Sequence, residues 1–314
     1  MKNGSVPVLI TWDVDPDLWI PLENRKQALR AAMNLCHDLG IRATFFVTAQ
    51  PAHLLADELE TMQVQGHEAG CHGLTHGNEE DYDRMPEEMQ QAYIEEATET
   101  LQEVVGQPIL AFRSPRVKTS ARTLGILTQY GYRSDSSVCS QRVDFISSNL
   151  INPGWLFSPR RPYRPHRDSA FKAGDMPIWE IPVSAIAMPF ISSLLRVVGP
   201  PAMKMFFKTL YAESRLTGKP IVYLAHPTEF LGGSSEKKAG QRYTSYIRRE
   251  YFSPSFIRTH GLRMRNSFYR FNGQELLAGS RELFAYMASF SDVKFMTVTE
   301  YVQHNLMGVE YQRG

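Results

Sequence analysis

The sequence predicts an α/β fold, a distorted (β/α) barrel that forms one domain of 314 residues. Short apolar runs rich in β-branched and aromatic residues alternate with longer segments of helical period, as in parallel sheets with crossover helices. Polar residues with reactive side chains recur where these runs end. That is the edge at which barrels build their sites.

Eight runs are candidate strands. They cover residues 8–13, 43–48, 67–71, 109–113, 133–138, 178–184, 220–225 and 295–298. The first candidate helix carries an apolar stripe from Leu29 to Cys36 and ends at Gly40, a residue suited to a helix C-cap. Further helices are expected over 52–65 and over 86–106, the latter opened by Pro86 and closed by Gly106.

Two segments interrupt the alternation. Residues 139–177 and the basic and aromatic residues 231–270 are expected to be long loops over the catalytic face. The motif-bearing core spans about residues 8–230, and a helix, a strand and a helix are expected over 271–314.

Composition excludes several classes of protein. The 34 basic and 33 acidic residues nearly cancel, so the chain has no global field to attract nucleic acid. Three cysteines, Cys36, Cys71 and Cys139, make no even disulfide framework and favour a reducing compartment. An apolar run too short for a signal segment and the lack of a membrane-spanning stretch predict a cytoplasmic protein.

The densest chemical signal is a pair of histidines, His72 and His76, in a short loop after a candidate strand. Two imidazoles aimed at one point can bind zinc or a similar metal, although such a pair also arises by chance on surfaces. Asp13 and Asp15 follow the first strand, so one carboxylate can join the histidines while the other acts as a base. The alternative for such acids is a helix cap or solvated loop, for which Asp17 is the better candidate.

Five motifs follow one another in the order of a known family. They are Thr11-Trp12-Asp13-Val14-Asp15, His72-x-x-x-His76, Phe112-Arg113-Ser114-Pro115, Tyr132-Arg133-Ser134-Asp135-Ser136-Ser137 and Leu224-Ala225-His226-Pro227. In these residues the chain resembles the polysaccharide deacetylase family, the NodB-homology or carbohydrate esterase family 4 group. The Asp-x-Asp form of the first motif is similar to the branch that includes allantoinase-like amide hydrolases.

The resemblance implies a NodB-like barrel and one divalent metal, zinc, held by Asp15, His72 and His76. It implies that Asp13 is the general base and His226 the general acid. By the same analogy, Arg113 positions Asp13, and Asp135 orients His226 and keeps it charged.

Candidate substrate contacts are less specific. Arg160 and Arg161 lie in an arginine-rich run that can grip a phosphate or carboxylate, or can be a solvated loop. Trp12 and Ser114 stand beside motif residues and are added as candidates. The apolar segment 181–203 can pack in the core or touch a membrane with Phe190 and Leu195.

These observations predict a metal-dependent deacetylase acting on an amino sugar, which can be a lipid-linked or phosphorylated precursor of a surface polysaccharide. Such an enzyme would work in the cytoplasm, in peripheral contact with the inner membrane face, and could form oligomers. The alternatives are a small-molecule amidohydrolase, allantoinase-like or deformylase-like, and a catalytically silent glycan-binding module.

Overall fold

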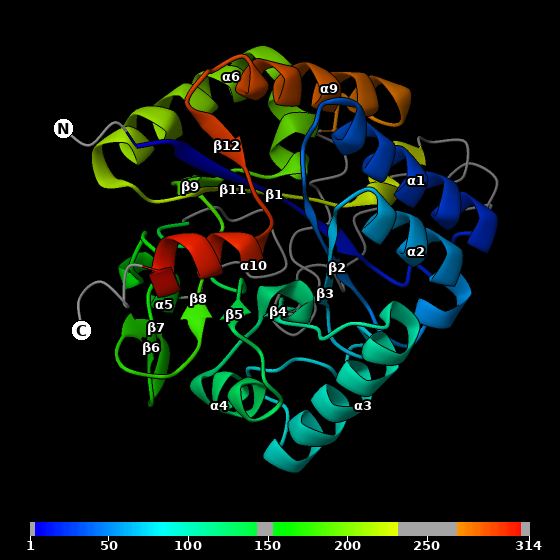
Figure 1. Cartoon of the computed structure of the whole chain (residues 1–314), viewed down its shortest axis with the longest axis vertical. Helices are drawn as coiled ribbons and strands as arrows, with labels where there is room; N and C mark the ends of the chain where they lie inside the picture. The colour runs from blue at the N-terminus through cyan, green and yellow to red at the C-terminus, as the bar shows by residue number, and fades with distance from the viewer. Residues whose placement is uncertain (1–3, 143–152, 232–268, 309–314) are drawn as a thin grey trace, which may run out of the picture.

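A parallel sheet that curves into a half-barrel forms the centre of the molecule (Figure 1). The computed structural model describes residues 4–142, 153–231 and 269–308. Seven strands lie in the order β11 (Ile221–Ala225), β1 (Val6–Val14), β2 (Thr44–Val47), β3 (Glu68–Cys71), β4 (Ala111–Phe112), β5 (Ser134–Asp135) and β8 (Trp179–Glu180). An eighth strand, β12 (Val293–Phe295), pairs with the first residues of β1. Each predicted strand overlaps one of these, and the predicted distorted barrel is confirmed.

The two ends of the sheet approach each other beyond β8. The backbone N–H of Ser184 donates to the carbonyl of Val222 in β11 at 3.1 Å. The side-chain oxygen of Ser184 accepts from the Val222 N–H at 2.9 Å. These contacts draw the segment after β8 onto β11, so the curved sheet comes close to closing.

Helices cover the outside of the curved sheet (Figure 1). They are α1 (Leu22–Asp38), the short η1 (Ala52–Leu55), α2 (Ala56–Val64), α3 (Glu87–Val105) and α4 (Ala121–Gln129). The predicted stripe from Leu29 to Cys36 is buried in α1. Gly106 ends α3 in the left-handed conformation, with φ of 69°, as its position predicted.

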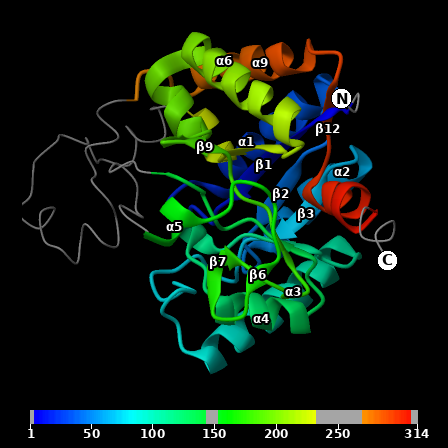
Figure 2. The ribbon, with the colours of Figure 1, turned by 90° about the vertical axis from the view of Figure 1, so that its left-hand side faces the viewer.

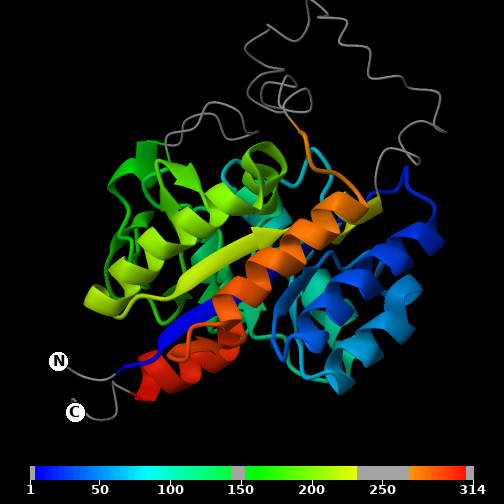
Figure 3. The ribbon, with the colours of Figure 1, turned by 90° about the horizontal axis from the view of Figure 1, so that it is seen from above.

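A long helix, α6 (Ser192–Thr217), packs on β1 and β11, and α9 (Gln274–Ala288) packs on α6 (Figure 3). Gly199, with φ of 76°, kinks α6 just before Pro200 and Pro201. Phe190 and Leu195 are fully buried, so of the two interpretations of segment 181–203 the core-packing one holds for these residues. Within the described part of the chain, no helix combines the length and the apolar character needed to cross a bilayer.

The first interrupted segment is more ordered than its sequence predicted. It holds α5 (Pro153–Phe157) and an antiparallel hairpin of β6 (Pro165–His166) and β7 (Ser169–Ala173), with β7 beside α4 (Figure 2). A second hairpin joins β9 (Ala185–Ile186) to β10 (Met188–Pro189). Residues 143–152 and 232–268, including nearly all of the second predicted loop, lie outside the described residues.

Short elements complete the described chain. They are η2 (Pro115–Val117), η3 (Pro227–Leu231), α10 (Val298–Tyr301) and a π-helical turn, Val302–Met307. The predicted helix, strand and helix at the end of the chain therefore correspond to α9, β12 and α10.

Candidate metal centre and active site

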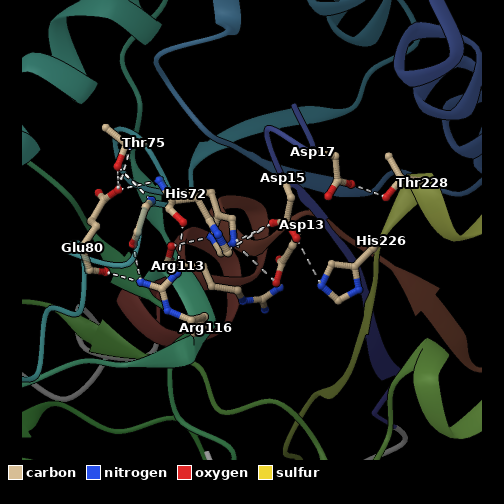
Figure 4. Close-up of polar contacts among 12 residues, drawn as sticks. Asp13, Asp15, Asp17, His72, Thr75, Glu80, Arg113, Arg116, His226 and Thr228 are labelled. Atoms are coloured by element: carbon tan, nitrogen blue, oxygen red, sulfur yellow. Dashed lines mark hydrogen bonds and ion pairs between the residues drawn. The ribbon is translucent and has the colours of Figure 1, made fainter. Parts of the chain in front are cut away.

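Three metal-type side chains meet at the carboxyl ends of β1 and β3 (Figure 4). Asp15 follows β1, and His72 follows β3. The Asp15 Oδ1 atom lies 3.3 Å from His72 Nε2 and 3.5 Å from His76 Nε2. One ligand atom from each residue lies within 4.8 Å of the other two. These are the three residues to which the motifs assign the metal.

The surroundings of this triad fit a bound cation. The Nδ1 atom of His72 lies 2.7 Å from the backbone carbonyl of Arg113, to which it donates when it carries the proton. That bond leaves Nε2 free as a ligand, a common arrangement in histidine metal sites. The Asp15 Oδ1 atom is buried and accepts no hydrogen bond within the described structure. A divalent metal would satisfy this atom, so the donor set fits zinc.

The buried carboxylate of Glu80 holds the loop that carries the histidines (Figure 4). It accepts hydrogen bonds from the backbone N–H groups of Leu74, Thr75 and His76 at 2.7, 2.7 and 2.6 Å. Gly73 lies against the same carboxylate, because a Cβ atom there would meet Glu80 Oε1 at 2.4 Å. The loop conformation is therefore fixed by a charge at its centre.

Arg116 braces the same loop from outside. Its guanidinium donates to the carbonyls of His76 and Gly77 at 3.0 and 2.8 Å, and to Asp81 at 2.8 Å. Neither Glu80 nor Arg116 was predicted as a site residue. The only signal in the sequence was the place of Arg116 directly after the third motif, Phe112-Arg113-Ser114-Pro115.

Asp13 is paired with a fully buried arginine. Arg113 Nη1 donates to Asp13 Oδ1 at 2.8 Å and to the Thr11 hydroxyl at 2.8 Å. The Nη2 and Nε atoms of Arg113 donate to the side chain and carbonyl of Ser136. The contact that the resemblance implies between Arg113 and Asp13 is present, and the carboxylate is held in one orientation.

His226 follows β11 and lies beside the triad. Its Nε2 atom is 4.0 Å from Asp15 Oδ2, and its Nδ1 atom is 3.9 Å from Glu229 Oε1. Burial opposes the protonation of His226, but the charges of Asp15 and Glu229 outweigh this effect and raise its pKa above the usual value. The predicted direction of the pKa shift is therefore correct, while its sources differ from the predicted one.

Asp135 does not contact His226, although the resemblance implies that it orients this ring. Within the described residues, only Asp15 and Glu229 place carboxylates within 4.0 Å of the imidazole. Asp135 instead lies opposite Glu180 in the pairing of β5 with β8, and it accepts a hydrogen bond from Ser137 at 2.6 Å. The role that we predicted for Asp135 is wrong in this geometry.

The carboxyls of Asp135 and Glu180 are fully buried neighbours. Burial raises the pKa of Asp135 to about 6, although hydrogen bonds from Ser137 and Glu180 oppose the shift. Burial and the nearby Asp135 charge raise the pKa of Glu180 well above its usual value. Burial therefore favours the protonated form of Glu180, whose Oε1 atom accepts a hydrogen bond from the Val138 N–H at 2.9 Å.

Asp17 is a further acid at this edge of the sheet. It is buried, and it accepts a hydrogen bond from the Thr228 hydroxyl at 2.5 Å (Figure 4). Burial and the charge of Asp15 raise the pKa of Asp17 to about 6. Burial also opposes the ionisation of Asp15, but the nearby imidazoles of His76 and His72 outweigh it and lower its pKa. The solvated-loop alternative for Asp17 is wrong.

Trp12 and Ser114 are not available to a substrate, because both are fully buried. Side chains alternate along β1, so Trp12 points away from Asp13 and packs on Phe45 and Phe230. The backbone N–H of Ser114 donates to Ser137. Both assignments are wrong, and the alternation of β1 was a signal that could have excluded Trp12.

The two candidate arginines have different surroundings. The guanidinium of Arg160 forms two hydrogen bonds with the carboxylate of Glu213, at 2.8 and 2.6 Å. It is therefore occupied by a partner within the chain, which contradicts its assignment as a substrate clamp. Arg161 is exposed and forms no ion pair with a described residue.

The fold and this edge define a NodB-like half-barrel with one candidate metal centre in its described residues. Residues 2–134 match the family model described as polysaccharide deacetylase, which confirms the resemblance. That span holds the first three motifs and the start of the fourth. A comparison with curated proteins found no significant match.

Solved structures share the fold at low sequence identity. A "putative polysaccharide deacetylase" from Mycobacterium smegmatis has a TM-score of 0.63 at 16% identity, over 100% of this chain and 93% of that one. A "probable polysaccharide deacetylase" from Pseudomonas aeruginosa PAO1 has a TM-score of 0.59 at 14% identity, over 96% and 91%. The Puue allantoinase has a TM-score of 0.58 at 14% identity, with the same coverage. These likenesses show the fold.

Proposed function

We propose that the protein is a metal-dependent hydrolase that removes an N-acyl group from an amino sugar. The acyl group that we propose is acetyl. One observation carries the proposal. The triad of Asp15, His72 and His76 lies together with the arginine-paired Asp13 and with His226 at one edge of the sheet. These groups supply a metal site, a base and an acid.

Each group has a defined part in amide hydrolysis. A divalent metal, when bound, supplies Lewis acidity toward the amide carbonyl and toward water. Asp13 accepts the proton of the attacking water, and its pairing with Arg113 keeps the carboxylate aimed. His226 donates a proton to the leaving amine nitrogen, and its raised pKa favours the protonated form.

The decisive experiment measures acetate and formate release from a panel of N-acylated amino sugars. We expect release that a chelator abolishes and that added zinc restores. Metal analysis of protein purified without added metal should find about one zinc per chain, because two histidines and one carboxylate suit zinc. Release that is unaffected by removal of all bound metal would contradict the proposal.

A narrower proposal is that the substrate is an amino sugar that bears a phosphate or is linked to a lipid. The exposed Arg161 supports it, because a guanidinium can bind phosphate, whereas Arg160 is paired with Glu213 and gives no such support. The test compares kcat/KM for one N-acetyl sugar presented free, as a phosphate ester and as a polyprenyl phosphate. Equal values, or no effect of Arg161→Ala on the phosphorylated forms, would contradict it.

A second candidate function is hydrolysis of a small cyclic or linear amide. It is favoured by the Asp13-Val14-Asp15 form of the first motif and is compatible with the fold shared with an allantoinase. Turnover of allantoin or a formamide without turnover of any N-acetyl sugar would favour this candidate. Glycan binding without turnover of either substrate class would favour a silent binding module.

A further inference from the structure

The imidazole of His226 has an unusual gap in its hydrogen bonding. Its Nδ1 atom is buried and has no hydrogen-bond partner within the described structure. A buried polar atom without a partner costs free energy, so a nearby acceptor should exist when the site works. The nearest carboxylate oxygen is Oε1 of Glu229, at 3.9 Å.

Glu229 has a matching gap. Its Oε2 atom is also buried without a hydrogen-bond partner in the described residues. Glu229 lies in η3, three residues after His226, so both side chains leave the same short turn. A hydrogen bond between these two atoms would give each of them its missing partner.

The other oxygen of Glu229 is anchored. Arg196 Nη1 lies 3.3 Å from Oε1 of Glu229. Arg196 is itself fixed, because it donates to Asn272 and its guanidinium stacks 3.8 Å above the ring of Tyr269. The arginine fixes the orientation of the carboxylate while its other oxygen has no partner within the described structure.

We propose that Glu229 is the positioning residue for His226. It accepts a hydrogen bond from Nδ1–H, which fixes the ring so that Nε2–H faces the leaving nitrogen. This inference rests on the proposed function, in which His226 is the general acid. It assigns to Glu229 the part that the motifs imply for Asp135, which is engaged with Ser137 and Glu180.

The activity test uses two substrates that differ in their leaving group. An amide needs its nitrogen protonated to leave, whereas 4-nitrophenyl acetate releases a phenolate that leaves without an acid. Glu229→Ala should lower kcat on the N-acetyl sugar by about 10- to 100-fold, as for other groups that orient a histidine. It should leave kcat on 4-nitrophenyl acetate within about two-fold. A structural defect would lower both rates together.

A double-mutant cycle tests whether Glu229 acts through His226. If it does, adding Glu229→Ala to His226→Ala costs no further activity on the amide. Glu229→Gln keeps the shape and an acceptor oxygen, so it should regain part of the loss and should also fold. Glu58→Gln removes another ion-paired glutamate, one that contacts Arg30, and serves as the matched control without effect. Additive losses in the double variant would overturn the proposal.

A measurement without substrate separates this inference from the proposed function. Long-range ¹H–¹⁵N NMR of the metal-loaded protein reports which ring nitrogen of the neutral His226 carries the proton. We expect Nδ1–H in the parent and a mixture of the two tautomers in Glu229→Ala. If the parent hydrolyses no N-acyl sugar but the tautomer changes, the positioning stands and the proposed function fails. An unchanged tautomer overturns the positioning.

Discussion

At the residue scale, the fully buried Arg113 is the side chain that most clearly orients a neighbouring group of the candidate site. It forms hydrogen bonds with Asp13, Thr11 and Ser136 and stacks 4.3 Å above the ring of Phe46. Burying a guanidinium is costly unless its donors are paired, and this one is paired on several sides. The carboxylate of Asp13 is therefore oriented before any substrate arrives, as efficient proton transfer requires.

Removal of either proton-transfer group should abolish most activity without loss of metal. Asp13→Asn and His226→Ala should each lower kcat/KM by about 10² to 10⁴-fold, the usual contribution of general acid–base catalysis. Because the pKa of His226 is raised, kcat/KM should stay high above the usual pKa of a histidine and fall as pH rises further. Steady-state kinetics against pH, with metal analysis of each variant, checks both points. Activity within a few-fold of the parent would exclude that residue from the mechanism.

The ligand residues should behave differently from the proton-transfer groups. His72→Ala and His76→Ala should each remove the metal while the fold persists, because each loses one of three donors. Atomic emission analysis after gel filtration, with circular dichroism as the folding control, measures both properties. Stoichiometric metal in either variant would place the metal elsewhere.

At the scale of elements, the histidine loop between β3 and α3 depends on a carboxylate that touches no metal. Glu80→Gln keeps the shape of the side chain but removes the charge that three backbone N–H groups share. Metal affinity should fall by about 10- to 100-fold, as for other groups behind metal ligands. Competition with a chromogenic chelator measures the change. The neighbouring Glu79→Gln, exposed and bonded only to the Thr75 hydroxyl, should have little effect, and equal losses in both variants would contradict this interpretation.

The strands and most helices of the fold could be predicted from the sequence. All eight strands of the main sheet overlap predicted strands. Strands β1, β2 and β11 are rich in β-branched or aromatic residues, whereas β5 consists of the polar Ser134 and Asp135. The site followed from the fold, since the ends of parallel strands meet at one edge. The helix α6 was not assigned, because Gly199, Pro200 and Pro201 read locally as a break and only packing against α9 carries the helix through the kink.

Partner choice between side chains could not be predicted. Asp135 is in the fourth motif and Glu229 lies two residues after the fifth, so each lies at or just after the end of a strand. Only the three-dimensional pairing of β5 with β8 joins Asp135 to Glu180. Glu229 is three residues from His226 in the sequence, but that spacing indicates contact only once the turn η3 is known. The sequence likewise does not show that Arg160 forms an ion pair with Glu213 of α6.

At the scale of the whole molecule, the buried acid pair of Asp135 and Glu180 makes stability depend on pH. The folded state holds a proton on Asp135 up to a pKa of about 6, whereas an unfolded aspartate releases it near the usual value of 3.8. The contribution of Asp135 to stability is therefore fully present below the usual pKa and is lost as pH rises through the raised one.

Asp135→Asn should remove this loss. The asparagine side chain keeps the shape of Asp135 but does not ionise, so its contribution to stability does not change as pH rises through about 6. Urea unfolding of metal-free protein at pH 4, 5, 6 and 7 measures the difference between parent and variant. Asp17 is the other acid whose pKa is raised to about 6, so Asp17→Asn is the control that measures its separate contribution to the pH dependence of stability. A difference that does not change between pH 4 and pH 6 would contradict this assignment.

The position of β1 sets the order in which the chain can fold. This strand is synthesised before the other strands of the sheet, yet Val8 pairs with both Ile221 of β11 and Phe295 of β12. Non-local parallel pairs form slowly, because a long loop must close before they contribute. During synthesis the growing chain therefore carries a paired half-sheet from β1 to β5 with an open apolar edge on β1. Pulse-labelling hydrogen exchange should find the amides of β2 and β3 protected before those of β11 and β12, so the catalytic edge gains His226 only in the last stage of folding.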